Sequence, residues 1–98
     1  MKRMHDIAAS LGIAIDADWR GIESVWPLLD RMRAEGAVVI VKLDGQRARD
    51  QYTVLATHAV KNVFARCDAE TLEAATCAVI AQYAEALWPA PTDPELLP

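Results

Sequence analysis

Four side chains in this chain of 98 residues belong to the types that bind metals or attack substrates: His5, His58, Cys67 and Cys77. Their spacing contains neither the CxxC nor the HExxH pattern that marks common zinc sites. His58 and Cys67 are predicted to end neighbouring strands, so a cross-strand Cys–His nucleophile pair is the catalytic arrangement to consider. No serine lies in a GxSxG motif, and the four glycines are too scattered for a phosphate loop. We therefore expect no catalytic residue, no metal and no cofactor, and two reduced thiols.

Charged side chains suggest a different chemistry. The formal net charge is −4, so binding to nucleic acid would need a local basic patch that works against an acidic surface. Arg47 and Arg49 lie in a polar loop and are the best candidates for contact with a phosphate or another anion. The other basic residues are scattered along the sequence, which is typical of a solvated surface.

Length and composition predict one domain with one core. Apolar residues make up 53% of the chain, and no apolar run approaches the roughly 20 residues of a transmembrane helix. Acidic and polar residues interrupt the N-terminal segment, which is therefore unlike a secretory signal, and we expect a cytoplasmic protein. Residues 1–88 are predicted to form the domain. Four prolines between Pro89 and Pro98 predict an extended, loose tail.

Helical periodicity predicts three helices, at about His5–Leu11, Ser24–Glu35 and Ala69–Leu87. Ser24 and Asp68 are of the types that cap helix N-termini, and Gly36 is a typical residue at the end of a helix. Short apolar segments rich in β-branched residues predict three strands, at Ala37–Leu43, Gln51–His58 and Val63–Cys67. The two connections between strands are short, which favours an antiparallel meander. The fold class is therefore α+β, a two-layer sandwich with the order α-α-β-β-β-α.

This order resembles the topology of double-stranded-RNA-binding domains and of HicB-type antitoxins. The HicB likeness runs from the second strand to the last helix and rests on Thr71-Leu72-Glu73-Ala74, which opens a helix after a strand. Double-stranded-RNA-binding domains carry lysines where their last helix begins. The matching segment here, 68–73, is acidic, so the resemblance implies the fold but not RNA binding.

Alternation along the strands predicts an outer face of the sheet that no helix covers. It would expose four apolar side chains, Val38, Ile40, Leu55 and Phe64, with Lys42, Thr53, Thr57 and Arg66 around them. Such a patch measures about 300–400 Å², the size that marks interfaces. The alternative is that the connector Ile13–Asp18, or the first helix, folds across this face and buries it.

The predicted function is that of a small acidic protein without catalytic activity that binds another protein. An inhibitor, an antitoxin-like or immunity-like protein and an adaptor all fit this description, and the partner could be a second copy of the chain in a homodimer. A nucleic-acid-associated module that uses Arg47 and Arg49 is the alternative, and a small enzyme that uses His58 and Cys67 ranks last. Three tryptophans, Trp19, Trp26 and Trp88, are either packed at the edge of the core or exposed as anchors for a partner.

Overall fold

The computed structural model describes residues 1–88; the predicted proline-rich tail lies outside the described residues. Its elements in chain order are α1 (Lys2–Ser10), the 3₁₀ helix η1 (Ile22–Val25), α2 (Trp26–Ala34), β1 (Val38–Leu43), β2 (Tyr52–His58), β3 (Val63–Ala69) and α3 (Leu72–Leu87). The order α-α-β-β-β-α and the α+β class are confirmed.

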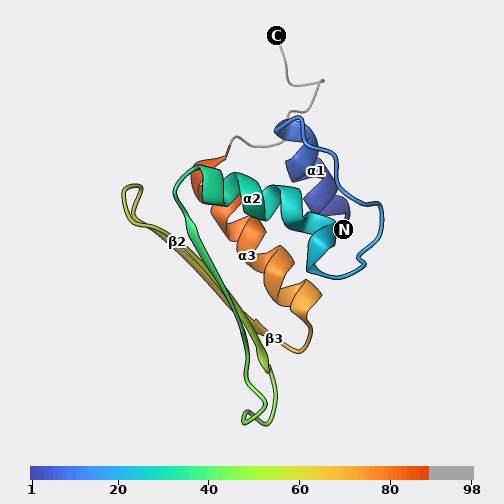
Figure 1. The fold of residues 1–98 in the computed structure, drawn as a ribbon, viewed down its shortest axis with the longest axis vertical. Coiled ribbons are helices and arrows are strands. Elements are labelled where there is room, and N and C mark those ends of the chain that lie inside the picture. Colours follow the sequence, from blue (N-terminus) through green and yellow to red (C-terminus); the bar gives the residue numbers. More distant parts are fainter. Residues whose placement is uncertain (89–98) are drawn as a thin grey trace.

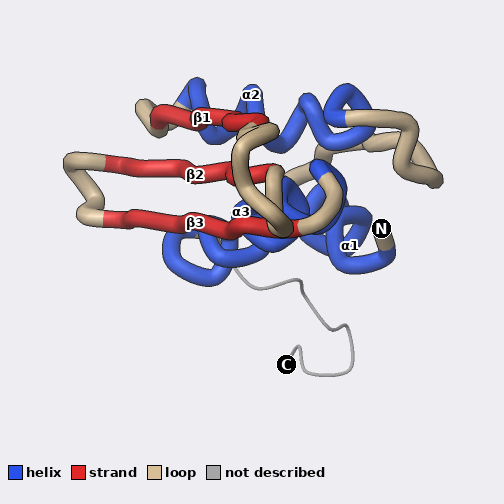
Figure 2. Tube along the Cα trace, turned by 90° about the horizontal axis from the view of Figure 1, so that it is seen from below, coloured by secondary structure: helices blue, strands red, loops and turns tan. Residues whose placement is uncertain are grey.

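The three strands form one antiparallel meander in the order β1-β2-β3 (Figure 2). The register places Ile40 opposite Leu55, and Leu55 opposite Arg66. Because side chains alternate between faces along a strand, this register decides which residues share each face of the sheet.

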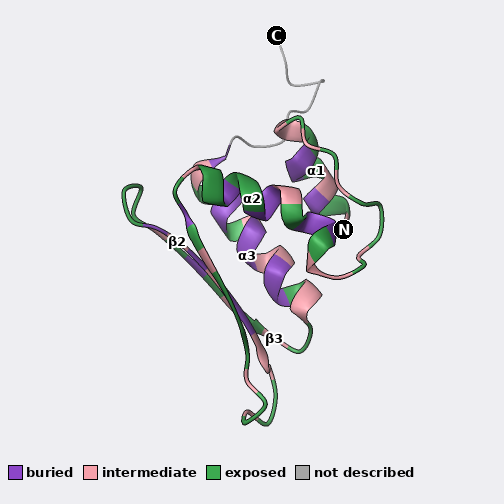
Figure 3. Ribbon diagram, viewed as in Figure 1, coloured by how far each residue is buried: buried purple, intermediate pink, exposed green. Residues whose placement is uncertain are grey.

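All the helices lie on one side of the sheet (Figures 1 and 2). α3 packs on β2 and β3, α2 packs beside β1, and α1 packs on α3. The buried side chains fill the space between the two layers (Figure 3); the largest that are fully buried include Tyr83, Leu28, Met32, Ile80, Val25, Val54 and Val79. Neither α1 nor the connector at 13–18 crosses the outer face, so the alternative in which they bury it is wrong.

Two predicted helix caps are wrong. Ser24 lies inside η1, where its buried hydroxyl accepts a hydrogen bond from the Arg20 backbone at 2.7 Å, and α2 begins at Trp26 without a side-chain cap. Asp68 belongs to β3, because pairing with β2 continues to Ala69 and keeps this segment extended. Thr71 caps α3 instead, through a hydrogen bond of 3.1 Å from the Ala74 backbone amide to its Oγ1.

The junction between α2 and β1 is held by Glu35 and Gly36. Gly36 has φ +99°, a conformation that favours glycine, and it turns the chain from the helix into the strand. The Glu35 carboxylate accepts hydrogen bonds from Tyr83, Trp88 and Arg31, each 2.9 Å long. These bonds fix the start of β1 against the far end of α3.

The same contacts change two pKa values. Burial alone would raise the pKa of Glu35, but the hydrogen bonds from Trp88, Tyr83 and Arg31 outweigh it and hold that pKa below its usual value. The pKa of Tyr83 is raised, first by burial and then by its hydrogen bond to the Glu35 carboxylate. Glu35 is therefore an ionised acceptor at neutral pH, and Tyr83 is a protonated donor.

Candidate interaction surface

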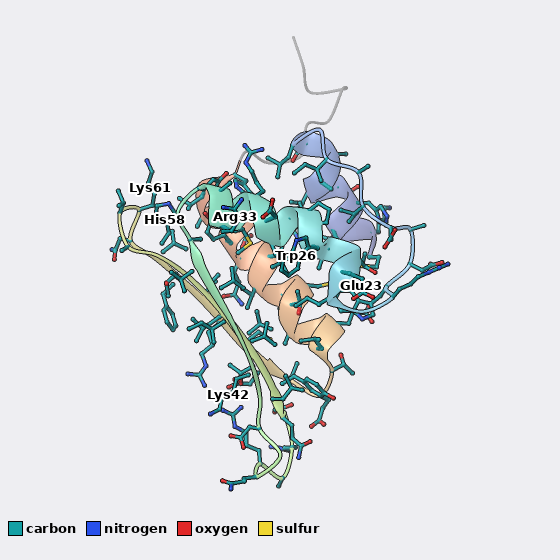
Figure 4. All side chains as sticks on the ribbon, viewed as in Figure 1. Glu23, Trp26, Arg33, Lys42, His58 and Lys61 are labelled. Atoms are coloured by element: carbon teal, nitrogen blue, oxygen red, sulfur yellow. The ribbon has the colours of Figure 1, made fainter. Side chains whose placement is uncertain are left out.

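The outer face of the sheet consists of three cross-strand rows. Register places Val38, Thr57 and Phe64 in the first row, Ile40, Leu55 and Arg66 in the second, and Lys42, Thr53 and Asp68 in the third. Figure 4 shows Lys42 on the side of the sheet away from the helices. The four predicted interface residues thus lie side by side in the first two rows.

Three of these four side chains are open to solvent. Val38, Ile40 and Phe64 are 56%, 48% and 68% exposed, whereas Leu55 on the central strand is half-buried between its neighbours. Exposed apolar side chains that adjoin one another on a sheet mark an interaction surface more strongly than the same number scattered singly.

The third row is closed by Arg47, which folds back from the loop between β1 and β2. Its guanidinium lies 3.3 Å from a carboxylate oxygen of Asp44 and 3.4 Å from one of Asp68, and it donates a hydrogen bond of 2.9 Å to Thr53 Oγ1. Thr53 is consequently buried, although alternation predicted it to look outward into solvent.

These contacts count against the proposed anion site. The Arg47 guanidinium has two carboxylate partners in its own chain, so an external phosphate would have to displace them. Arg49 is exposed two residues further along the same loop, and within residues 1–88 no ion pair holds it. The Asp68 carboxylate accepts from Thr53 and lies near Arg66 and Arg47, which together hold its pKa below the usual value.

The cross-strand Cys–His pair does not form. His58 pairs with Val63 at one end of the sheet, whereas Cys67 pairs with Val54, four residues further along. At about 3.3 Å per residue the separation is roughly 13 Å, too far for a hydrogen bond between the two side chains. Proximity of these residues was expected because each was predicted to end a strand. The last residues of two adjacent antiparallel strands, however, lie at opposite ends of the strand pair.

His58 has a structural role. Its Nδ1 accepts from the Lys61 backbone at 3.2 Å, so its Nε2 carries the hydrogen and donates to the Glu35 carbonyl oxygen at 2.8 Å.

Burial raises the pKa of the Cys67 thiol and also that of Cys77. Neither cysteine forms a disulfide, and both are half-buried and pack against the apolar core.

Two other kinds of site can be judged within the part of the chain that the structure covers. Residues 1–88 contain no group of three or more His, Cys, Asp or Glu side chains arranged to hold a metal ion. None of the helices described there has the length and apolar character needed to cross a bilayer.

β1 is exposed on its inner side as well, which the alternation pattern did not predict. Val41 and Leu43 point toward the helix layer, yet they are 37% and 67% exposed because the helices do not reach this end of the strand. Figure 3 shows β1 almost entirely in the colour of exposed residues. The sequence pattern of a strand does not show how much of its inner side a helix will cover.

A groove of about 230 Å³ lies between α2 and β1. Its walls include Trp26 and Leu29 on α2, and Val39 and Val41 on β1. Trp26 is exposed beside this groove, whereas Trp19 is half-buried and Trp88 is buried. Of the three tryptophans, Trp26 alone fits the prediction of an exposed anchor.

A search with this sequence finds no matching protein-family model, no curated protein and no solved structure that resembles it.

Proposed function

We propose that this chain is a small protein-binding module, without catalytic activity, that engages its partner through the outer face of the sheet. The observation that supports this most directly is the exposure of Val38, Ile40 and Phe64 on a face that no described element covers. The contacts of Arg47 and His58 count against the nucleic-acid and enzyme alternatives, because these side chains already have partners within the chain.

The chemistry of the surface indicates what a partner would offer. The centre of the outer face is apolar, and Lys42 and Arg66 lie beside it. A complementary surface would carry apolar side chains at its centre and polar or acidic groups at its rim. An inhibitor, an antitoxin-like or immunity-like protein or a cytoplasmic adaptor would work in this way, and the likeness to HicB-type antitoxins belongs to this proposal.

The test uses aspartate substitutions at exposed apolar positions. Ile40→Asp and Phe64→Asp place a charge on the outer face, while Val60→Asp places the same charge on the turn between β2 and β3, where valine is 88% exposed. All three variants should stay folded by circular dichroism, because exposed substitutions usually change stability by less than about 0.5 kcal/mol. Ile40→Asp should lose a binding partner or lower the molecular mass in light scattering, Phe64→Asp should lose a binding partner, and Val60→Asp should do neither.

Two results would contradict the proposal. If Ile40→Asp unfolds the protein, the residue is buried and the outer face is internal, since an unpaired buried carboxylate costs several kcal/mol. If both outer-face variants stay folded and keep the mass and the partners of the unmodified chain, the outer face is not an interaction surface.

A further inference from the structure

The two edges of the sheet are treated differently. At the β3 edge, the Gln82 side chain from α3 accepts from the Arg66 backbone N–H and donates to the Arg66 carbonyl oxygen, both at 3.2 Å. Free N–H and C=O groups at a sheet edge are a template on which another strand can pair. At the middle of β3, the Gln82 side chain takes up the Arg66 N–H and C=O groups that another strand would need.

The β1 edge has no such block. Along a strand, alternate residues direct their N–H and C=O groups toward the neighbouring strand and away from it. The hydrogen bond from the Asp44 N–H to the Gln51 carbonyl shows that Val38, Ile40 and Lys42, at even-numbered positions like Asp44, bond to β2. Val39, Val41 and Leu43 therefore direct their N–H and C=O groups away from the sheet. Within residues 1–88, no side chain and no other backbone segment forms a hydrogen bond with these groups.

Exposed apolar side chains gather around this open edge. Five of the seven large apolar side chains that are exposed in the described residues lie on β1 or at the start of α2: Trp26, Val38, Ile40, Val41 and Leu43. Val38 and Ile40 are on the outer side of β1, and Val41 and Leu43 are on its inner side. A partner lying flat on the outer face would leave the inner residues in water, whereas a strand added at the edge contacts both sides.

We propose that β1 pairs antiparallel with β1 of a second copy of this chain, so that two three-stranded sheets join into one of six strands. This inference rests on the proposed function, because it uses the same exposed strand for protein binding. A strand related to its partner by a two-fold axis meets an identical pattern of donors, acceptors and side chains, so the edge is complementary to itself.

The charges around β1 allow two copies to approach. The chain as a whole carries −4, which opposes association of like molecules. Beside β1, however, Lys42 lies 3.5 Å from Asp44, and Arg33 lies 2.8 Å from Asp30. Opposite charges are thus paired within each copy along this edge, so the repulsion between two copies there is smaller than the net charge of −4 suggests.

Charge also selects the register. Residues opposite each other in an antiparallel pair must both direct their backbone groups toward the partner strand or both away from it, so the two-fold axis passes through a residue. Near the middle of β1 this residue is Ile40, Val41 or Lys42. An axis at Lys42 would set the two lysines directly opposite each other, which is destabilising, and an axis at Val41 would set them diagonally. An axis at Ile40 places Ile40 against Ile40 and Lys42 against Val38, which keeps the lysines furthest apart.

The first test is the mass of the full chain by analytical ultracentrifugation, compared with twice the monomer mass of 10.8 kDa. Val41→Pro removes an outward N–H that the chain itself does not use and puts the proline ring in the path of a second strand. Val41→Thr keeps that N–H and the strand conformation, and is the matched control. The unmodified chain and Val41→Thr should be dimers, and Val41→Pro should weaken the dimer at least about tenfold, as the loss of two hydrogen bonds predicts.

A second variant decides the question if Val41→Pro fails to fold. Ile40→Cys should form a disulfide-linked dimer under mild oxidation, because an axis at this residue brings the two Cα atoms to about 4.5 Å. Val60→Cys, at a residue in the β2–β3 turn that is 88% exposed against 48% for Ile40, should cross-link only as fast as random collision allows. A monomeric unmodified chain at about 100 μM, or equal cross-linking of the two cysteine variants, would overturn strand pairing.

Phe64→Asp separates this inference from the proposed function. Phe64 lies on β3, at the other side of the sheet, so strand pairing at β1 leaves it uncovered. The variant should remain a dimer. A monomeric unmodified chain that loses a binding partner on Phe64→Asp would overturn the dimer and leave the outer-face function standing.

Discussion

Replacing Glu35 by alanine should test whether one carboxylate holds the α2–β1 junction against α3. The substitution removes the acceptor of the Tyr83 hydroxyl and of the Trp88 indole N–H, both of which belong to buried residues. It also removes the ion pair with Arg31, which is exposed and contributes little. Tyr83 and Trp88 pack edge to face at 5.1 Å, so neither ring can turn its polar atom to solvent without breaking that contact.

The expected loss follows from these two donors. A buried donor without a partner costs about 1–3 kcal/mol. Because the Glu35 side chain is 28% exposed, water can reach part of the vacated space, and the low end of that range applies to each donor. The total is then about 2–3 kcal/mol, which corresponds to a fall of about 10–20 °C in Tm for a domain of this size.

Thermal denaturation followed by circular dichroism measures this effect, with Glu85→Ala on the exposed side of α3 as control. A double-mutant cycle with Tyr83→Phe isolates the Tyr83 hydrogen bond, since Glu35→Ala should cost less once the hydroxyl is gone. A Tm within about 4 °C of the unmodified protein would refute the reasoning, as would an equal cost of Glu35→Ala with and without the Tyr83 hydroxyl.

The lowered pKa of Glu35 adds a dependence on pH. A carboxyl whose pKa is lower in the folded state stabilises the fold above its unfolded pKa, near 4.3, and this stabilisation disappears as pH falls through the folded pKa. Glu35→Gln keeps an acceptor oxygen but has no charge to lose. The difference in unfolding free energy between the unmodified protein and Glu35→Gln should therefore shrink below about pH 4, and a difference that stays constant from pH 3 to 7 would contradict the role of the charge.

Three further outcomes are expected. Gly36→Val should lower the unfolding free energy by more than about 1 kcal/mol, because φ +99° is strained for a β-branched residue although its Cβ would meet His58 only at 3.7 Å; an unchanged Tm would refute this. Cys67 and Cys77 should react slowly with iodoacetamide at pH 6–7, since burial raises both thiol pKa values; thiolate-like rates would revive the enzyme alternative. Gel shifts with duplex DNA and RNA should be absent even at low salt, where phosphate contacts are strongest, and a shift abolished by Arg49→Ala would revive the nucleic-acid alternative.

The element order could be predicted from the sequence because each element carries a local signal. Alternating β-branched residues and short polar connections identify the meander, and Gly36 marks the end of α2. The caps were mispredicted because Ser24 and Asp68 are good capping residues whose local preference is overridden by other contacts. Ser24 is held by Arg20 and Asp18, and Asp68 is held in the strand ladder.

The candidate site shows where prediction from the sequence ends. Alternation places Val38 and Ile40 on the outer face correctly, because the period of two is a property of the strand itself. Whether Val41 and Leu43 are covered depends on how far the helices reach over β1, which is decided by packing between distant segments. Arg47 is a similar case, because its pairing with Asp68 joins residues 21 positions apart through the sheet register.

The β3 edge of the sheet is partly blocked and the β1 edge is open, and this difference indicates which edge can bind a second chain. Gln82 forms hydrogen bonds with the backbone at the middle of β3. On β1, valine, isoleucine and leucine side chains are exposed on both faces of the strand. An exposed edge with apolar side chains invites uncontrolled pairing, and proteins usually blunt such edges with charge, proline or a covering element. A two-fold pairing of β1 with itself uses the open edge, so that both outer edges of the joined sheet are β3 strands. Gln82 blocks the middle of each of these edges, and we therefore expect assembly to stop at two copies. Association that continues beyond two in ultracentrifugation would show that the block at β3 does not serve this purpose.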